Sequence, residues 1–98
     1  MSIDLGVKDL DVETLERLII IIERNIRKYI FSQVNQKDVI DLSISAEINQ
    51  EESLLIDIEV DAEIQNMVDN EIKLLIEKAI DQADYAVSSE LKQLKRKK

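Results

Sequence analysis

Apolar residues recur every three or four positions over the first third of the chain. Leu15 and Leu18 belong to this series, and the spacing places its members on one side of an α-helix. Asp11 stands just ahead of the pattern as a predicted N-cap, and Asn35 stands just behind it as a predicted C-terminal cap. The pattern therefore predicts a helix over residues 11–34.

The hydrophobic period changes to two in the middle of the chain. Apolar and polar residues alternate over residues 38–48 and again over residues 54–64, with a polar stretch between the two runs. Alternation of this kind is typical of strands that have one buried and one solvated face. A short polar connection between two such strands predicts an antiparallel hairpin. We expect the apolar set, which begins at Ile40, to face the core.

A second helical pattern fills the remainder of the chain. Asp69 precedes it as a predicted N-cap, and the small residues Ala79 and Ala83 lie within its apolar stripe. We expect a helix over residues 69–95, followed by a basic C-terminal tail. The first ten residues follow neither period and are expected to form an irregular lead-in.

The order helix, strand, strand, helix defines the expected fold. An isolated two-stranded hairpin is only marginally stable in water, so two helices are expected to cover its apolar face. The fold class is therefore α+β, a two-layer α/β sandwich of order α-β-β-α. A length of 98 residues is typical of one domain, residues 1–98. Both edges of the hairpin are expected to remain free.

Three stretches of the chain carry a family resemblance. They are residues 29–32 (YIFS), residues 48–64 (INQEESLLIDIEVDAEI) and the pair Val68-Asp69 that opens the last helix. They resemble a small uncharacterised archaeal family whose genes tend to lie beside that of the prefoldin beta subunit, near exosome and RNA polymerase subunit genes. The resemblance implies an archaeal, cytoplasmic protein with no established activity, and it supplies no catalytic residue.

Composition removes several kinds of chemistry. The chain has no histidine and no cysteine, which removes the commonest general base, the thiolate nucleophile, disulfides and Cys-based zinc sites. It also has no phosphate loop or dinucleotide fingerprint. We therefore predict a protein that is not an enzyme and takes no cofactor or small-molecule substrate. The longest apolar run, residues 18–22, is too short to span a bilayer, and no secretion signal is visible, so a cytoplasmic location is expected.

Acidic residues dominate the other face of the predicted hairpin. They are Asp41, Glu47, Asp57, Glu59, Asp61 and Glu63. Such a row could hold Mg²⁺ or Ca²⁺, and paired carboxylates could serve acid–base chemistry. However, side chains two residues apart on a strand lie about 7 Å from each other, which is wider than one small ion requires. We interpret the row as the solvated face of a protein of net charge −8, and we predict no metal site.

Two sets of residues are candidates for binding. Large apolar residues outside the predicted helix stripes favour contact with another protein or a second copy: Ile20, Ile21, Phe31, Leu74 and Tyr85. Basic residues on the first helix and in the tail would suit the phosphates of RNA: Arg24, Arg27, Lys28, Lys95, Arg96, Lys97 and Lys98. The net charge of −8 and the scarcity of aromatic residues weigh against RNA. The leading prediction is a protein–protein interaction module, accessory to a larger archaeal assembly, and RNA binding is the alternative.

Self-association is the form of interaction that the chain itself suggests. A closed two-fold dimer would cover the apolar excess with few new contacts. Pairing of strand edges would gather the acidic faces of both chains, whereas packing of the helix backs would not. The sequence therefore favours a helix-mediated dimer.

Overall fold

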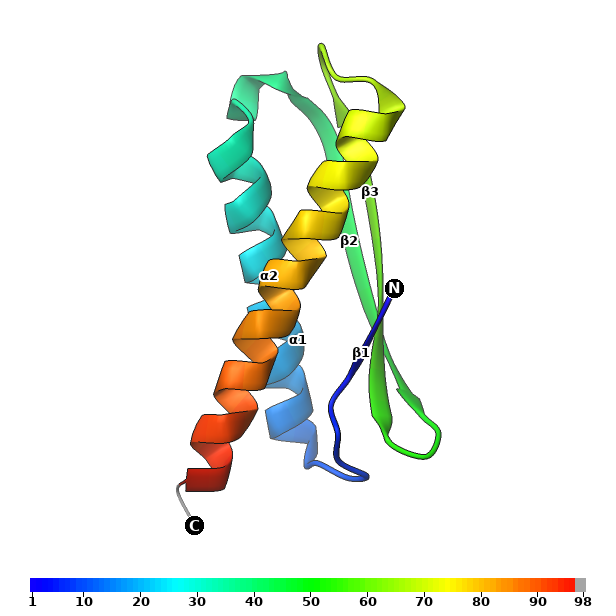
Figure 1. Cartoon of the computed structure of the whole chain (residues 1–98), viewed down its shortest axis with the longest axis vertical. Coiled ribbons are helices and arrows are strands. Elements are labelled where there is room, and N and C mark those ends of the chain that lie inside the picture. The colour runs from blue at the N-terminus through cyan, green and yellow to red at the C-terminus, as the bar shows by residue number, and fades with distance from the viewer. Residues whose placement is uncertain (97–98) are drawn as a thin grey trace.

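Two antiparallel helices cover one face of a three-stranded antiparallel sheet in the computed structural model (Figure 1). The model describes residues 1–96, and it describes side chains for residues 1–93. The elements are β1 (Ser2–Asp4), α1 (Val12–Gln33), a 3₁₀ turn (Gln36–Asp38), β2 (Val39–Gln50), β3 (Leu54–Ile64) and α2 (Asp69–Arg96). The predicted two-layer α+β sandwich is confirmed, with an additional strand at the N-terminus.

β3 is the central strand, and the sheet order is β1-β3-β2. β2 and β3 pair along their length, with Ile44 opposite Val60 and Ala46 opposite Ile58. The even-numbered residues of β3 face the helices, so Ile56 and Ile58 are buried, whereas Glu59 faces water. The faces predicted from the period of two are therefore correct for β3, because each residue along a strand points opposite to the one before it.

β2 departs from the predicted pattern near its start. Val39 pairs with Ile64 and Asp41 pairs with Glu63, so Ile40 has no partner opposite it. One extra residue in a strand is a β-bulge, and a shift of one residue exchanges the two faces. Ile40 is consequently 56% exposed instead of buried as predicted, and Val39 packs against the core in its place.

β1 forms where the sequence predicted only an irregular segment. Ser2, Ile3 and Asp4 lie opposite residues 55–57 of β3, and Ile3 is buried. The backbone N–H of Ile58 also donates to the carbonyl of Met1 at 2.6 Å. The predicted lead-in is thus wrong for residues 2–4, and one of the two expected free edges is covered along half of its length.

The core lies between the helix pair and the sheet. Leu18, Ile22, Ile26 and Ile30 of α1 are fully buried, as are Ala79 and Ala83 of α2. Helix axes approach more closely where the side chains at the contact are small, so the two alanines allow α2 to lie against α1. The predicted stripes of both helices are confirmed at these positions.

The helix ends differ in detail from the prediction. Asp11 makes no capping hydrogen bond, and the C-cap of α1 is Val34 instead of Asn35. Asn35 caps the following 3₁₀ turn, where its side chain accepts a hydrogen bond from the backbone N–H of Lys37 at 3.1 Å. α2 begins at Asp69 itself, which therefore lies within the first turn and does not precede it.

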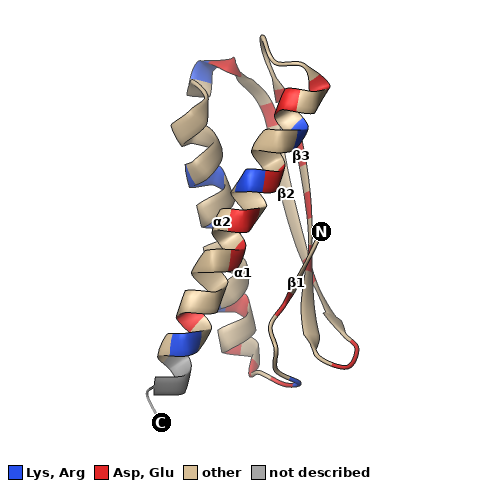
Figure 2. Cartoon of the chain, viewed as in Figure 1, with Lys and Arg blue, Asp and Glu red and all other residues tan. Residues whose placement is uncertain are grey.

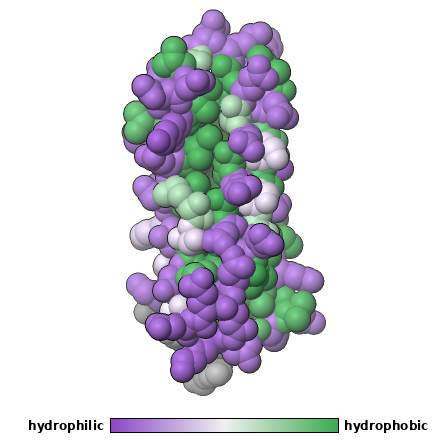
Figure 3. Space-filling model, turned by 90° about the vertical axis from the view of Figure 1, so that its right-hand side faces the viewer, coloured by the Kyte–Doolittle hydropathy of each residue, from purple (hydrophilic) through white to green (hydrophobic). Residues whose placement is uncertain are grey.

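Polar and apolar surface are unevenly distributed. Figure 2 shows that acidic residues lie along the strands and on both helices and that basic residues are fewer. Seen from the side in Figure 3, hydrophobic surface lies between hydrophilic margins in the upper half of the view, and hydrophilic surface covers the centre of the lower half. The two layers therefore leave part of their apolar surface uncovered. No helix among the described residues is long and apolar enough to cross a membrane.

Candidate binding site at the open edge of the sheet

The predicted interface residues of α1 lie in different surroundings. Ile20 is 53% exposed, whereas Ile21 is half-buried and packs against the core. Both border a hollow beside the ion pair of Arg17 with Glu90, whose charged atoms are 3.5 Å apart. Exposed ion pairs contribute little to stability, but this one joins the start of α1 to the end of α2.

The remaining predicted interface residues are exposed but dispersed. Phe31 is 37% exposed near the end of α1, and Leu74 and Tyr85 are 58% and 79% exposed on α2. Leu74 lines a hollow between the end of α1 and the start of α2, and Tyr85 lines a separate one on α2. The structure therefore does not gather the five residues into one apolar patch.

Three of the predicted basic residues share one helix. Arg24, Arg27 and Lys28 are exposed on α1, and none of them forms an ion pair within the described part of the chain. The side chains of Lys95 and Arg96, and all of Lys97 and Lys98, lie outside the described residues. The basic surface is thus placed only for α1.

The acidic face of the sheet is solvated. Glu47 lies opposite Asp57 and Asp41 opposite Glu63, all on the side away from the helices. Asp57 accepts hydrogen bonds from the Ser2 hydroxyl and from the Asn49 side chain. Among the described residues, no group of three acidic side chains is arranged to hold a metal ion.

Asp4 ties the N-terminal segment to the hairpin turn. Its carboxylate accepts hydrogen bonds from the Gly6 N–H at 2.9 Å and from the Ser53 hydroxyl at 2.7 Å. These two donors stabilise the charged form, so they lower the pKa of Asp4 from its ordinary 3.8. Gly6 adopts φ +69°, a left-handed conformation that glycine enters without steric cost. These contacts hold β1 in place beside β3.

β1 pairs with the first half of β3, and no described strand pairs with the second half on that side. The backbone groups of Leu54 and Ile58 point toward the β1 side, where they bond to Leu5, Val7 and Met1. Successive residues of a strand direct their backbone groups to alternate sides, so those of Val60 and Ala62 point to the same side, beyond the end of β1. This unpaired stretch, residues 60–64, is about 17 Å long at 3.4 Å per residue. We call it the open edge.

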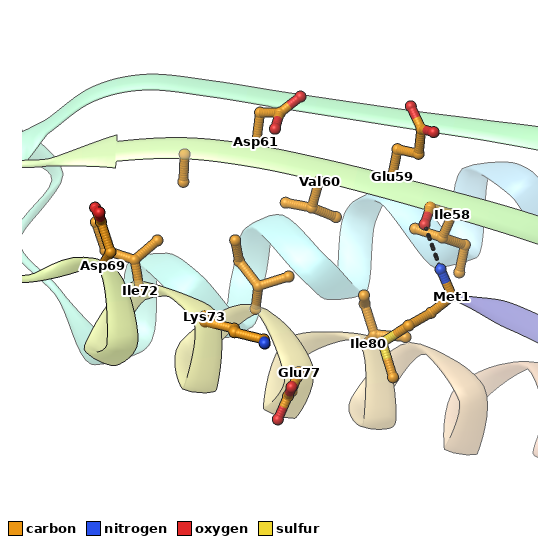
Figure 4. A pocket seen from close by; sticks show the side chains of 12 residues that line it. Met1, Ile58, Glu59, Val60, Asp61, Asp69, Ile72, Lys73, Glu77 and Ile80 are labelled. Atoms are coloured by element: carbon orange, nitrogen blue, oxygen red, sulfur yellow. Dashed lines mark hydrogen bonds between the residues drawn. The ribbon is translucent and has the colours of Figure 1, made fainter.

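A groove of about 640 Å³, with apolar walls and charged margins, runs between the open edge and α2 (Figure 4). Val60 points from β3 into the groove, and Ile72 faces it from the first turns of α2. Burial falls from Ile58, which is 1% exposed, to Val60 and Ala62, which are only partly buried, and rises again at Ile64. Ile72 and Ile76 are also only partly buried. We call this hollow the edge groove.

The rim of the edge groove is mainly acidic. Glu59 and Asp61 project from β3 away from the groove, and Asp69 and Glu77 border it on α2; the positive groups beside it are Lys73 and the ammonium of Met1. An added strand would therefore meet apolar side chains on its inner face and carboxylates on its outer face. Among the residues that line the groove, none is a serine, threonine or cysteine nucleophile beside an activating base. The apolar walls and the open backbone edge would suit an added strand.

Sequence reasoning assigned the edge-groove residues to the closed core. Val60, Ala62, Ile72 and Ile76 all follow the helical or strand period of buried residues. The period shows which way a side chain points, but the cover over it depends on neighbouring elements. No local pattern in the sequence marks these residues as less covered, because their cover depends on which strands pair with β3.

The fold and the candidate site define a class: a small two-layer α+β protein with an open-edged sheet and a groove beside that edge. Residues 7–90 match the family described as a protein of unknown function, DUF3194. The chain belongs to this family. Two relatives are uncharacterised proteins of Pyrococcus furiosus and Pyrococcus horikoshii, with 34% and 35% identity over 94% of this chain and 83% and 79% of theirs. The resemblance to an uncharacterised archaeal family is thereby confirmed, and these relatives come from thermophiles.

Two solved structures share the fold. A crystal structure from Thermococcus onnurineus superposes with a TM-score of 0.81 at 26% identity, over 100% of this chain and 95% of that chain. The solution structure of a hypothetical protein from Methanothermobacter thermautotrophicus gives a TM-score of 0.70 at 20% identity, over 89% of this chain and 94% of that chain. The second likeness concerns the fold alone.

Proposed function

We propose that this protein is a non-catalytic protein–protein interaction module that binds an extended segment of a partner polypeptide at the open edge of β3. The single observation that carries the proposal is that β1 pairs only with residues 55–57 of β3, so that no described strand pairs with residues 60–64 on this side, beside a groove with apolar walls. Strand addition to an exposed sheet edge is a general mode of peptide recognition, in which backbone hydrogen bonds supply affinity and alternate side chains supply specificity.

The surroundings of the open edge specify the chemistry of this segment. Its inward side chains would lie over Ile72 and Ile76, which favours aliphatic residues. Its outward side chains would lie beside Glu59, Asp61 and the solvated carboxylates of β3, which favours Lys or Arg. Opposite charges on neighbouring strands stabilise a pair by about 0.2–1 kcal/mol. The preferred ligand is therefore a segment of about five residues in which aliphatic and basic side chains alternate.

The proposed partner is a subunit of a larger archaeal assembly. The family resemblance implies this setting through the gene neighbourhood, and the family itself carries no assigned activity. Proteins that bind nucleic acids carry Lys and Arg on their surfaces. A basic strand of such a partner would suit the acidic residues beside the open edge.

Titration with a synthetic peptide tests the proposal. The probe is an eight-residue peptide, capped at both ends, in which valine and lysine alternate, and its control replaces every lysine with glutamate. The amide NMR signals of residues 60–64 are followed as each peptide is added. We expect saturable shifts at these amides with the lysine peptide and none with the glutamate peptide, because the rim of the edge groove repels added carboxylates.

Matched variants at one position isolate the role of the backbone. Ala62→Pro removes an N–H at the open edge without removing a bond to β2, and proline is tolerated on an edge whose N–H faces solvent. Ala62→Val keeps that N–H. We expect Ala62→Pro to weaken lysine-peptide binding about tenfold or more, equivalent to about 1.4 kcal/mol, and Ala62→Val to change it little. Equal affinities for the two variants, or shifts confined to other residues, would refute strand addition.

One observation favours RNA binding as a second function. Arg24, Arg27 and Lys28 are exposed and unpaired within the described residues, and Phe31 offers a partly exposed ring on the same helix. Basic side chains beside an aromatic ring can bind the phosphates and stack on a base of single-stranded RNA. A complex of this kind weakens steeply as salt rises, whereas a strand added over an apolar groove does not.

A further inference from the structure

β2 forms the other edge of the sheet, and this edge is open along its full length. β3 bonds to β1 through its even-numbered residues, so it bonds to β2 through the odd-numbered ones. The odd-numbered residues of β2 therefore face β3, and the backbone groups of residues 42, 44, 46 and 48 point away from the sheet. No described residue hydrogen-bonds to these groups from outside the strand.

Apolar side chains along this edge are incompletely covered. Leu42, Ile44 and Ala46 face the helices but are only half-buried, and Ile48 is 36% exposed. Long open edges with apolar side chains pair with other chains unless charges or bulges prevent it. The only bulge of β2 lies at its beginning, next to Ile40, so residues 41–50 remain regular.

The sequence of β2 is complementary to itself in one antiparallel register. When Ser45 lies on the two-fold axis, Asp41 faces the partner's Asn49 and Ser43 faces the partner's Glu47. No carboxylate then directly faces another carboxylate, which lowers the cost that the two acidic faces impose on edge pairing. On the inner face, Leu42 meets the partner's Ile48 and Ile44 meets the partner's Ala46, so two central pairs of one large and one small side chain lie between two pairs of large ones.

Neighbouring registers are less favourable. An axis at Ile44 sets Asp41 against the partner's Glu47 and draws the bulge at Ile40 into the paired region. An axis at Ala46 pairs residues 42–50 and sets the apolar Leu42 against the partner's Gln50, with Asp41 beside Glu51 of the partner's turn. An axis at Ser43 shortens the overlap and includes the bulge. The Ser45 axis keeps the bulge at the very end of the paired stretch, where an irregular strand costs least.

We propose that two copies of this chain pair through β2 about a two-fold axis at Ser45, which joins their sheets into one six-stranded sheet. The order across it is β1-β3-β2 in one protomer followed by β2-β3-β1 in its partner. Residues 42–48 would contribute about eight hydrogen bonds between the protomers. The contact is isologous and therefore closes at two copies. Both edge grooves remain open at the outer ends, so the dimer presents two of them.

Cysteine cross-linking tests the position of the axis, because the chain has no native cysteine. Ser45→Cys would place two thiols at a directly opposed pair with Cα atoms about 4.5 Å apart, within the range of a disulfide. Ser43→Cys is the matched control, since its two copies would be about 14 Å apart. Both serines are exposed on the outer face, so neither change disturbs the core. We expect mild oxidation to give a covalent dimer for Ser45→Cys and none for Ser43→Cys.

Sedimentation equilibrium supplies the complementary test. The unmodified protein should give twice the 11.3 kDa mass of one chain. Ser45→Arg opposes two positive charges at the axis and should shift the protein toward monomer, whereas Ser43→Arg faces the partner's Glu47 and should preserve the dimer. A monomer at all concentrations, or cross-linking of Ser43→Cys as readily as Ser45→Cys, would overturn the proposal. Lysine-peptide binding by Ser45→Arg should be unchanged, which separates failure of this dimer from failure of the edge-groove function.

Discussion

Truncation of Ile58 should destabilise the protein strongly because this residue lies at the centre of the core between the two layers. Its side chain is 1% exposed, it faces Ala46 across the β2–β3 ladder, and its backbone bonds to Met1 of the N-terminal segment. Ile58→Ala removes three carbon atoms from the core. At about 0.8 kcal/mol for each buried carbon, the lost transfer free energy is about 2.4 kcal/mol.

The cavity left by this truncation adds to the cost. Hydrogen-bonded strands on both sides hold the backbone of Ile58 in place, and the small Ala46 opposite it has no length with which to fill the space. Incomplete collapse raises the loss in the free energy of unfolding to about 3–4 kcal/mol, within the range measured for such changes. For a domain of this size the melting temperature should fall by roughly 4–8 °C per kcal/mol.

Two neighbouring residues serve as controls for Ile58. Glu59→Ala changes an exposed side chain and should alter the free energy of unfolding by about 0.5 kcal/mol or less. Val60→Ala removes two carbons from the partly buried wall of the edge groove and should cost about 1 kcal/mol. Guanidinium unfolding followed by circular dichroism measures all three. Equal losses for Ile58→Ala and Glu59→Ala would refute the assignment of the faces, and a large loss for Val60→Ala would show that the edge groove is closed.

Three further predictions concern charge. Because the pKa of Asp4 is lowered, its contacts stabilise the fold fully above about pH 3.8 and are lost as the pH falls through the lowered value. Asp4→Asn has no carboxylate to protonate. Its free energy of unfolding should therefore fall less than that of the unmodified protein when the pH is lowered through this range. Saturating Mg²⁺ or Ca²⁺ should leave the melting temperature nearly unchanged. A specific site filled at 100 times its dissociation constant would instead raise the free energy of unfolding by about 2.7 kcal/mol. Such a gain, abolished by Asp57→Asn or Asp61→Asn, would show that the acidic face binds a metal ion. If α1 binds single-stranded RNA, Arg24→Gln and Arg27→Gln should each reduce the slope of log affinity against log salt by about 0.7, and an unchanged slope would exclude this surface.

The sequence determined the layers and faces of the hairpin. A strict period of two over residues 54–64 fixed which side chains point to the helices, since this direction is a local property of an extended backbone. The buried stripes of α1 and α2 followed from the helical period in the same way. The absence of histidine and cysteine, a property of composition alone, excluded imidazole and thiolate chemistry.

Tertiary structure alone decided where the sheet ends. β1 contains three residues, too few to show a period, and it becomes a strand because β3 offers an edge and Asp4 binds the hairpin turn. The bulge at Ile40 arises where β2 must meet Ile64 at the far end of β3, which no local pattern reveals. Long-range pairing thus determined which apolar residues are covered, and the sequence period determined only the direction in which they point. The edge groove and the free edge of β2 are consequences of that difference, because exposure depends on neighbours that lie far away in the chain.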